Sequence, residues 1–165
     1  MGRLTAYGGA SGATLTVSTT ESLTLNGRDY GGYVTRQISN VKNVDKRIET
    51  IPASEIVLAT FSTAVAGGTY DVDKVKYMRF TNLDDTNHIT LIFATAGSHE
   101  FAVKVDAGCS LSIFGDVIDT GTSGGFMSMF DANTSALTVA LDNLASITAE
   151  ANTGACDMEV YIALI

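Results

Sequence analysis

Short runs in which apolar and polar residues alternate, separated by turn signals, constrain this chain more than any other feature of its sequence. Beyond residue 46 they recur at intervals of about ten to twelve residues, the spacing of antiparallel sandwiches and small barrels. Thr and Gly are abundant, and only 17% of the residues are charged, whereas a helical bundle would be rich in Ala, Glu, Lys and Leu. Because 45% of the residues are hydrophobic, the chain can build a core. The sequence predicts an all-β protein whose residues 47–165 form one antiparallel β-sandwich.

Several segments carry the strand pattern most clearly. Val75 and Tyr77 should share one face of their strand, and Met78 and Phe80 the other. The apolar run at residues 158–165 should be buried within a sheet, since an exposed one would promote aggregation. The predicted strands are residues 47–51, 56–61, 74–80, 88–94, 100–105, 109–114, 126–130, 136–141, 145–150 and 158–165, with a polar turn at 82–87 and an exposed loop at 116–125.

Residues 1–46 differ from the rest because they are polar, mixed in charge and too poor in apolar residues to form a core alone. Two short alternating runs, Leu15 with Val17 and Leu23 with Leu25, precede Asn26-Gly27, the strongest hairpin signal in the chain. We expect this segment to be an N-terminal arm with an early hairpin that packs along its own domain or along a neighbour.

The charge distribution excludes some classes of partner. The chain has a net charge of -8 and a pI near 4.5, which argues against binding to a nucleic acid backbone. Residues 1–80 carry +2 and residues 81–165 carry -10, so an acidic solvated surface or two complementary surfaces could result. No run approaches a membrane span, and no signal peptide is evident. Cys109 and Cys156 are expected to be buried free thiols, with a cross-strand pair as the alternative, in keeping with a protein made and assembled in a reducing cytoplasm.

No motif predicts catalysis or a cofactor. His88 and His99 lack the spacing of a metal site, and the aspartates near residues 71–73 and 84–85 do not match a calcium loop. Gly121–Gly125 has glycines around a serine but lacks the following helix and the histidine partner of a nucleophile elbow. We therefore expect neither an enzyme nor a metal or cofactor site, with a small β-sandwich hydrolase as a remote alternative.

Contact with a partner is the remaining role, and its candidates are aromatic residues in predicted loops and basic residues of the arm, together with Arg47 at the start of the first strand of the sandwich. Tyr70, in a predicted loop, is a further aromatic candidate. Lys42, Lys46 and Arg47 could form a basic cluster that touches an acidic surface. The full set of predicted partner-binding residues is Tyr7, Arg28, Tyr30, Tyr33, Arg36, Lys42, Lys46 and Arg47.

Residues 74–84, 88–91 and 103–108 resemble the small virion structural proteins of tailed bacteriophages, in which a strand leading to Asn-Leu-Asp precedes a polar turn and a hairpin. The resemblance implies a β-sandwich, jelly-roll-like, that decorates or cements a capsid or belongs to a neck or tail. It also implies a homo-oligomer, with a trimer expected, that contacts the major capsid protein or other virion proteins through its arms. The alternative is a carbohydrate- or receptor-binding sandwich of a phage neck, tail or adhesin.

Overall fold

The computed structural model describes residues 12–64, 66–97, 99–114 and 144–165, and every regular element among them is a β-strand. The predicted all-β class is confirmed. The strands predicted at residues 126–130 and 136–141, and the loop predicted at 116–125, lie outside the described residues.

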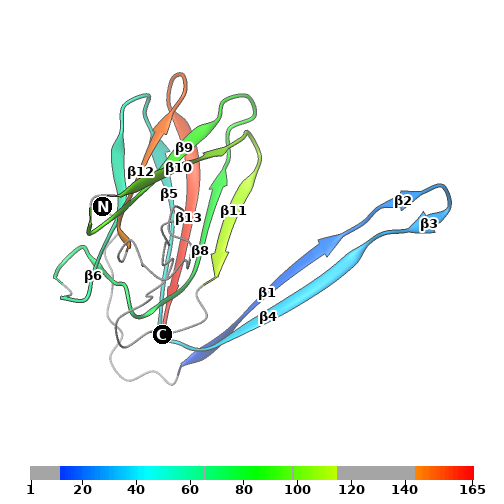
Figure 1. The fold of residues 1–165 in the computed structure, drawn as a ribbon, viewed down its shortest axis with the longest axis horizontal. Helices are drawn as coiled ribbons and strands as arrows, with labels where there is room; N and C mark the ends of the chain where they lie inside the picture. The colour runs from blue at the N-terminus through cyan, green and yellow to red at the C-terminus, as the bar shows by residue number, and fades with distance from the viewer. Residues whose placement is uncertain (1–11, 65, 98, 115–143) are drawn as a thin grey trace, which may run out of the picture.

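Two sheets form the sandwich (Figure 1). The first has four antiparallel strands in the order β11-β8-β13-β5, and the second has the order β10-β9-β12-β6-β7, in which only the short β6–β7 pairing is parallel. The first sheet comprises β5 (Asn43–Ile51), β8 (Val75–Asn82), β11 (Ser110–Phe114) and β13 (Cys156–Leu164). The second comprises β6 (Ile56–Ser62), β7 (Tyr70–Asp71), β9 (Ile89–Thr95), β10 (Glu100–Val105) and β12 (Leu144–Ala151).

The order of these strands is that of a jelly roll. If β7 is set aside, eight strands remain, and the first of them, β5, pairs with the last, β13. The second strand, β6, likewise pairs with the seventh, β12. The third and sixth strands, β8 and β11, complete the first sheet, and the fourth and fifth, β9 and β10, complete the second. Two interlocked Greek keys produce this order. The predicted jelly-roll-like sandwich is therefore the observed fold.

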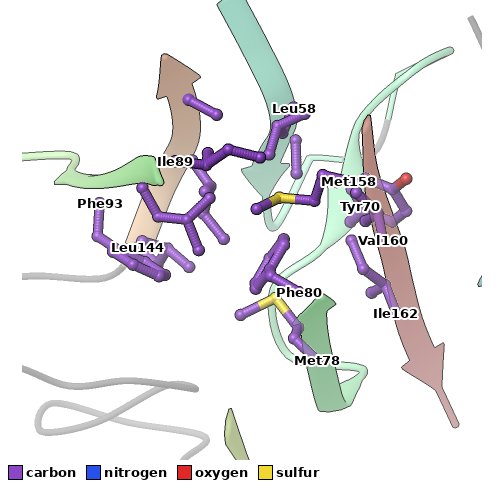
Figure 2. Close-up of a cluster of buried hydrophobic side chains, with 14 of the residues drawn as sticks. Leu58, Tyr70, Met78, Phe80, Ile89, Phe93, Leu144, Met158, Val160 and Ile162 are labelled. Carbon is purple, nitrogen blue, oxygen red and sulfur yellow. The ribbon is translucent and has the colours of Figure 1, made fainter. Parts of the chain in front are cut away.

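The core lies between the two sheets (Figure 2). Phe80 of the first sheet meets Phe93 of the second edge to face, with ring centroids 6.4 Å apart. β13 lies between β5 and β8 and contributes Met158, Val160 and Ile162, all with no exposed surface. The apolar run near the end of the chain is thus buried in a sheet, as predicted.

One prediction about side-chain direction in β8 is wrong. Val75 joins the core beside Met78 and Phe80, whereas Tyr77 points to the outer face of the sheet. The pairing with β13 shifts register here, so that Lys76 is an extra residue on β8. Such a bulge reverses the alternation locally, and a sequence pattern does not show it.

The polar turn after β8 forms as predicted, through side chains that bind the local backbone. Asp84 accepts hydrogen bonds from the amides of Thr86 (2.8 Å) and Asn87 (2.6 Å). These backbone hydrogen bonds, that from Asn87 first, lower the pKa of Asp84. The carboxylate therefore has a structural role within the turn.

The two cysteines differ in their surroundings. Cys156 is buried at the start of β13, whereas Cys109 is exposed in the turn before β11. The prediction of two buried thiols is wrong for Cys109, because the turn that contains it lies at the rim of the sandwich.

Candidate partner-binding surface

A long β-hairpin leaves the sandwich and projects well beyond it (Figure 1). Its strands are β1 (Ala13–Glu21) and β4 (Gly32–Val41), which form an antiparallel sheet of their own, and the short β2 (Thr24–Leu25) and β3 (Arg28–Asp29) near the tip. The predicted early hairpin is therefore present. Its neighbour β5 begins at Asn43, so that this strand of the sandwich crosses the division drawn at residue 46 from the sequence.

The turn at the tip is the one predicted. Asn26 and Gly27 both have positive φ, 52° and 76°, and they join the register partners Leu25 and Arg28. This is a two-residue turn whose twist matches that of paired strands. Gly31 is required nearby, since a Cβ there would lie 2.7 Å from the backbone oxygen of Glu21.

The root of the hairpin, residues 13–17 and 36–41, packs against the outer face of the first sheet. A second hydrophobic cluster, here called the outer cluster, forms there and includes Ile38, Val41, Tyr77 and Ala163, with Leu15, Val17, Phe114, Tyr161 and Ile165 packed against them. The guanidinium carbon of Arg36 lies 5.2 Å from the ring centroid of Phe114 on β11. The backbone amide of Lys42, which follows β4, donates a hydrogen bond to the carbonyl of Leu164 on β13 (2.9 Å). The root therefore starts beside β5 and crosses the sheet toward Phe114 on β11.

The two faces of the hairpin have different chemistry, because register partners share a face and successive residues alternate. Leu15 pairs with Ile38, Val17 with Arg36 and Thr19 with Val34, which places the root's apolar side chains and Val34 on one face. The opposite face carries Ser, Thr and Tyr, and Ser18 lies 3.3 Å from the hydroxyls of both Tyr33 and Thr35.

The apolar face continues past the edge of the sandwich. Leu23 accepts a backbone hydrogen bond from Tyr30 (2.8 Å), and Leu25 pairs with Arg28, so the alternation of the root extends to the tip. Leu23, Leu25, Tyr30 and Val34, here called the apolar strip, are between 53% and 69% exposed. The face of the hairpin that is covered at the root thus continues uncovered in the distal half, where it carries the apolar strip together with Glu21 and Arg28.

The predicted partner-binding residues do not all lie on this surface. Arg28, Tyr30, Tyr33 and Arg36 are on the hairpin, with Tyr33 on its polar face, and Lys42 links β4 to β5. Tyr7 lies outside the described residues.

Lys46 and Arg47 are not brought together, because consecutive residues of β5 point to opposite faces of the sheet. Lys46 is on the outer face and forms an ion pair with Glu159 (3.2 Å). The basic cluster proposed from the sequence therefore does not form one surface.

Arg47 points inward, where it belongs to an internal polar cluster with Asp45, Glu49 and Tyr70. Its guanidinium pairs with Asp45 and donates to the hydroxyl of Tyr70 (3.0 Å) and to the carbonyl of Leu58 (2.5 Å). Burial, with the hydrogen bond to Asp45, raises the pKa of Tyr70 to about 12. Tyr70 was expected in a loop, but it is buried in β7, where it holds this cluster instead of a partner.

The apolar strip was missed as a site because the prediction considered aromatic and basic residues alone. The signal was present in the sequence, since Leu15, Val17, Leu23 and Leu25 all have odd numbers and would share a face in a hairpin that turns at Asn26-Gly27.

Among the described residues, no three His, Cys, Asp or Glu side chains are grouped so that they could hold a metal ion. Within the same part of the chain there is no helix long and apolar enough to span a membrane.

Comparison with known proteins adds little to these observations. No family model matches the sequence, and no curated protein matches it. One solved structure, described as "Bacillus endospore appendages form a novel family of disulfide-linked pili", aligns with a TM-score of 0.44 and 11% sequence identity. The alignment covers 94% of this chain and 90% of that one.

Proposed function

We propose that this protein is a structural component of a tailed-phage virion, a capsid decoration or cement protein that attaches to neighbouring subunits through its projecting hairpin. The observation that supports this proposal is the apolar strip, Leu23, Leu25, Tyr30 and Val34, on a hairpin that leaves the sandwich. An exposed apolar strand surface promotes aggregation unless a partner covers it. A hairpin of this kind therefore has a role in contact with another surface.

The phage assignment itself depends on the resemblance of residues 74–84, 88–91 and 103–108 to virion structural proteins. From it follow the other parts of the proposal: a location in the virion, a homo-oligomer, and the major capsid protein or another virion protein as partner.

The energy expected from the strip suits a protein that acts in many copies. Covering the exposed parts of its four side chains contributes about 1 kcal/mol each. A total of about 4 kcal/mol corresponds to a dissociation constant near 1 mM, too weak for a single contact to persist. On a shell that offers repeated sites, several such contacts on one oligomer give far tighter attachment.

The test removes the distal half of the hairpin and keeps its root. Residues 18–35 are replaced by Asn-Gly, which joins the register partners Val17 and Arg36. Val17 lies eight residues before Leu25, and Arg36 lies eight residues after Arg28. Because the hydrogen-bonding pattern of paired antiparallel strands repeats every two residues, Val17 and Arg36 form the same type of pair as Leu25 and Arg28, and the new two-residue turn fits them as the native turn fits its own pair. We expect the shortened protein to fold and to lose binding to particles purified from a phage mutant that lacks the protein.

Co-sedimentation with those particles, followed by negative-stain microscopy, measures the binding. The control is Tyr33→Thr, which changes an exposed side chain on the polar face of the same hairpin and should leave binding intact. Undiminished binding of the shortened protein would contradict the proposal. A glycan-array signal that required Tyr30 and Tyr33 would favour the receptor-binding alternative.

A further inference from the structure

The edge strand β5 has exposed apolar residues on its outer face and charged residues on its inner face. Its outer face carries Val44 and Ile48, which are 49% and 62% exposed, with Lys46 between them in an ion pair with Glu159. Its inner face carries Asp45, Arg47 and Glu49, which form the internal polar cluster. In a sandwich, the inner face of a strand is ordinarily the apolar one. The outer face of β5 is therefore built as a surface that another element could cover.

This face belongs to the same side of the same sheet that the hairpin root already covers. The outer cluster involves β8, β11 and β13 through Tyr77, Phe114 and Ala163, but no residue of β5. The outer surface of β5 therefore continues an intramolecular interface whose other half is the hairpin's apolar face.

The strip and the outer face of β5 lie at opposite edges of one sheet, since β5 and β11 are its two edge strands. The hairpin crosses from the start of β5 over Ala163 and Tyr77 to Phe114, and it then leaves the sandwich on the β11 side (Figure 1). The apolar strip of a molecule consequently projects away from its own β5.

We propose that the apolar strip of one copy packs on the outer face of β5 in a second copy, which joins copies head to tail. The receiving side chains are Val44 and Ile48. This inference depends on the proposed function only in taking the hairpin as the docking element. It adds the identity of the receiving surface and the geometry of assembly.

The lengths of the two elements are compatible. From Val17 to Leu25 the hairpin extends about 26 Å, and the nine residues of β5 extend about 30 Å. The contact is heterologous, because two different surfaces meet, so it generates a ring if the rotation closes and a filament if it does not. A closed trimer is one such ring.

The first experiment is sedimentation equilibrium on the full chain at concentrations up to about 1 mM. Leu25→Thr on the strip and Ile48→Thr on β5 should each weaken self-association about tenfold. The matched controls are Tyr33→Thr, on the polar face of the hairpin, and Val57→Thr, an exposed apolar residue on the second sheet. Both controls should leave association within about twofold of the original. All four residues are more than half exposed, so each variant should fold.

The second experiment identifies the contacting surfaces directly by disulfide cross-linking. Leu25→Cys and Ile48→Cys proteins, each also carrying Cys109→Ser, are mixed and oxidised with copper phenanthroline. The mixture should give a cross-linked dimer that contains one of each protein, whereas Leu25→Cys mixed with Val57→Cys should not.

Three results would overturn the inference: a chain that stays monomeric, an Ile48→Thr variant that associates normally, or cross-links between two Leu25→Cys copies alone. If any of these occurred while the shortened hairpin still failed to bind particles, the proposed function would stand and the receiving surface would belong to another virion protein. If particle binding survived the shortening, the proposed function would fail first.

Discussion

At the scale of single residues, Arg47 shows how the same side chain can be read as a docking group or as a structural one. Only 16% of its side chain is exposed, and its guanidinium contacts Asp45, Tyr70 and the carbonyl of Leu58. Inward-pointing charges on an edge strand also oppose unwanted pairing with another sheet. From the sequence, Arg47 groups with Lys46 because the predicted strand begins at residue 47 and leaves Lys46 in the arm, so that strand alternation does not separate the two neighbours.

Removal of the Arg47 charge should destabilise the fold. Arg47→Met leaves the partly buried Asp45 carboxylate without its counter-charge and the Leu58 carbonyl without its donor, and we expect a loss of about 3 kcal/mol in the free energy of unfolding. Tyr70→Phe removes one hydroxyl and should cost only about 1 kcal/mol. Urea denaturation of the three proteins measures both changes. Equal stability of Arg47→Met and the original chain would show that the polar cluster does not contribute.

The hydroxyl of Tyr70 gives the fold a dependence on alkaline pH. Its pKa is about 12 in the folded chain and 10.0 ordinarily, because burial disfavours the phenolate and the hydroxyl donates a hydrogen bond to Asp45. A raised folded-state pKa gives stability that is complete below pH 10 and is lost as the pH rises toward 12. The urea midpoint of the original chain should fall over this interval more steeply than that of Tyr70→Phe. Parallel slopes would contradict the assignment.

At the scale of elements, the hairpin and the strands differ in how far the sequence could predict them. Asn26-Gly27 specified the turn, and β6, β9, β10 and β12 appeared close to their predicted positions, because local alternation and turn chemistry determine them. The partners of β13 could not be predicted, since Cys156 pairs with Ile51 from a distant part of the chain. The packing of the hairpin root on Tyr77 and Phe114 is a tertiary contact of the same kind.

Weakening the root should free the hairpin while leaving the sandwich intact. Ile38→Thr places a hydroxyl in the outer cluster, where Ile38 is buried. We expect trypsin to cleave after Arg36 about tenfold faster, because local opening of the root becomes easier. Cleavage after Arg28, at the exposed tip, is the internal reference and should not change. A rise at both sites alike would indicate general unfolding instead.

Val34→Thr is the matched control for this experiment. Val34 lies two residues from Arg36 on the same strand and is 69% exposed, so its replacement removes no buried contact. Cleavage after Arg36 should proceed at the original rate in this variant, and the thermal unfolding of the sandwich should be unchanged in both.

At the scale of the whole molecule, assembly should depend on apolar contact and not on net charge. The sequence suggested that a basic arm would meet an acidic surface. The structure instead pairs Lys46 with Glu159 and turns Arg47 inward, while the distal half of the hairpin carries Glu21 and Asp29 against Arg28. The asymmetry of charge between the two halves of the sequence did not predict this arrangement of charges, because folding places residues from both halves side by side, as with Lys46 and Glu159.

The expected consequence is weak dependence on salt. Between about 50 mM and 500 mM NaCl, where screening of exposed charges increases strongly, the association constant should change less than about twofold. Sedimentation equilibrium at the two salt concentrations measures it. A tenfold weakening at high salt would indicate that charged surfaces make the contact. Tyr33→Thr is again the appropriate control, since it alters the hairpin without altering its charge.

The central position of β13 also has a consequence for biosynthesis. Since β13 separates β5 from β8, β5 has no partner in this sheet, and β8 has only β11, until residues 156–164 have emerged from the ribosome. The four-stranded sheet must therefore close after most of the chain has been translated, by contacts between distant segments, which form slowly. Until then the apolar face of the hairpin root lacks Ala163 and Tyr161 beneath it. Nascent chains are thus the form of this protein that most needs protection from one another.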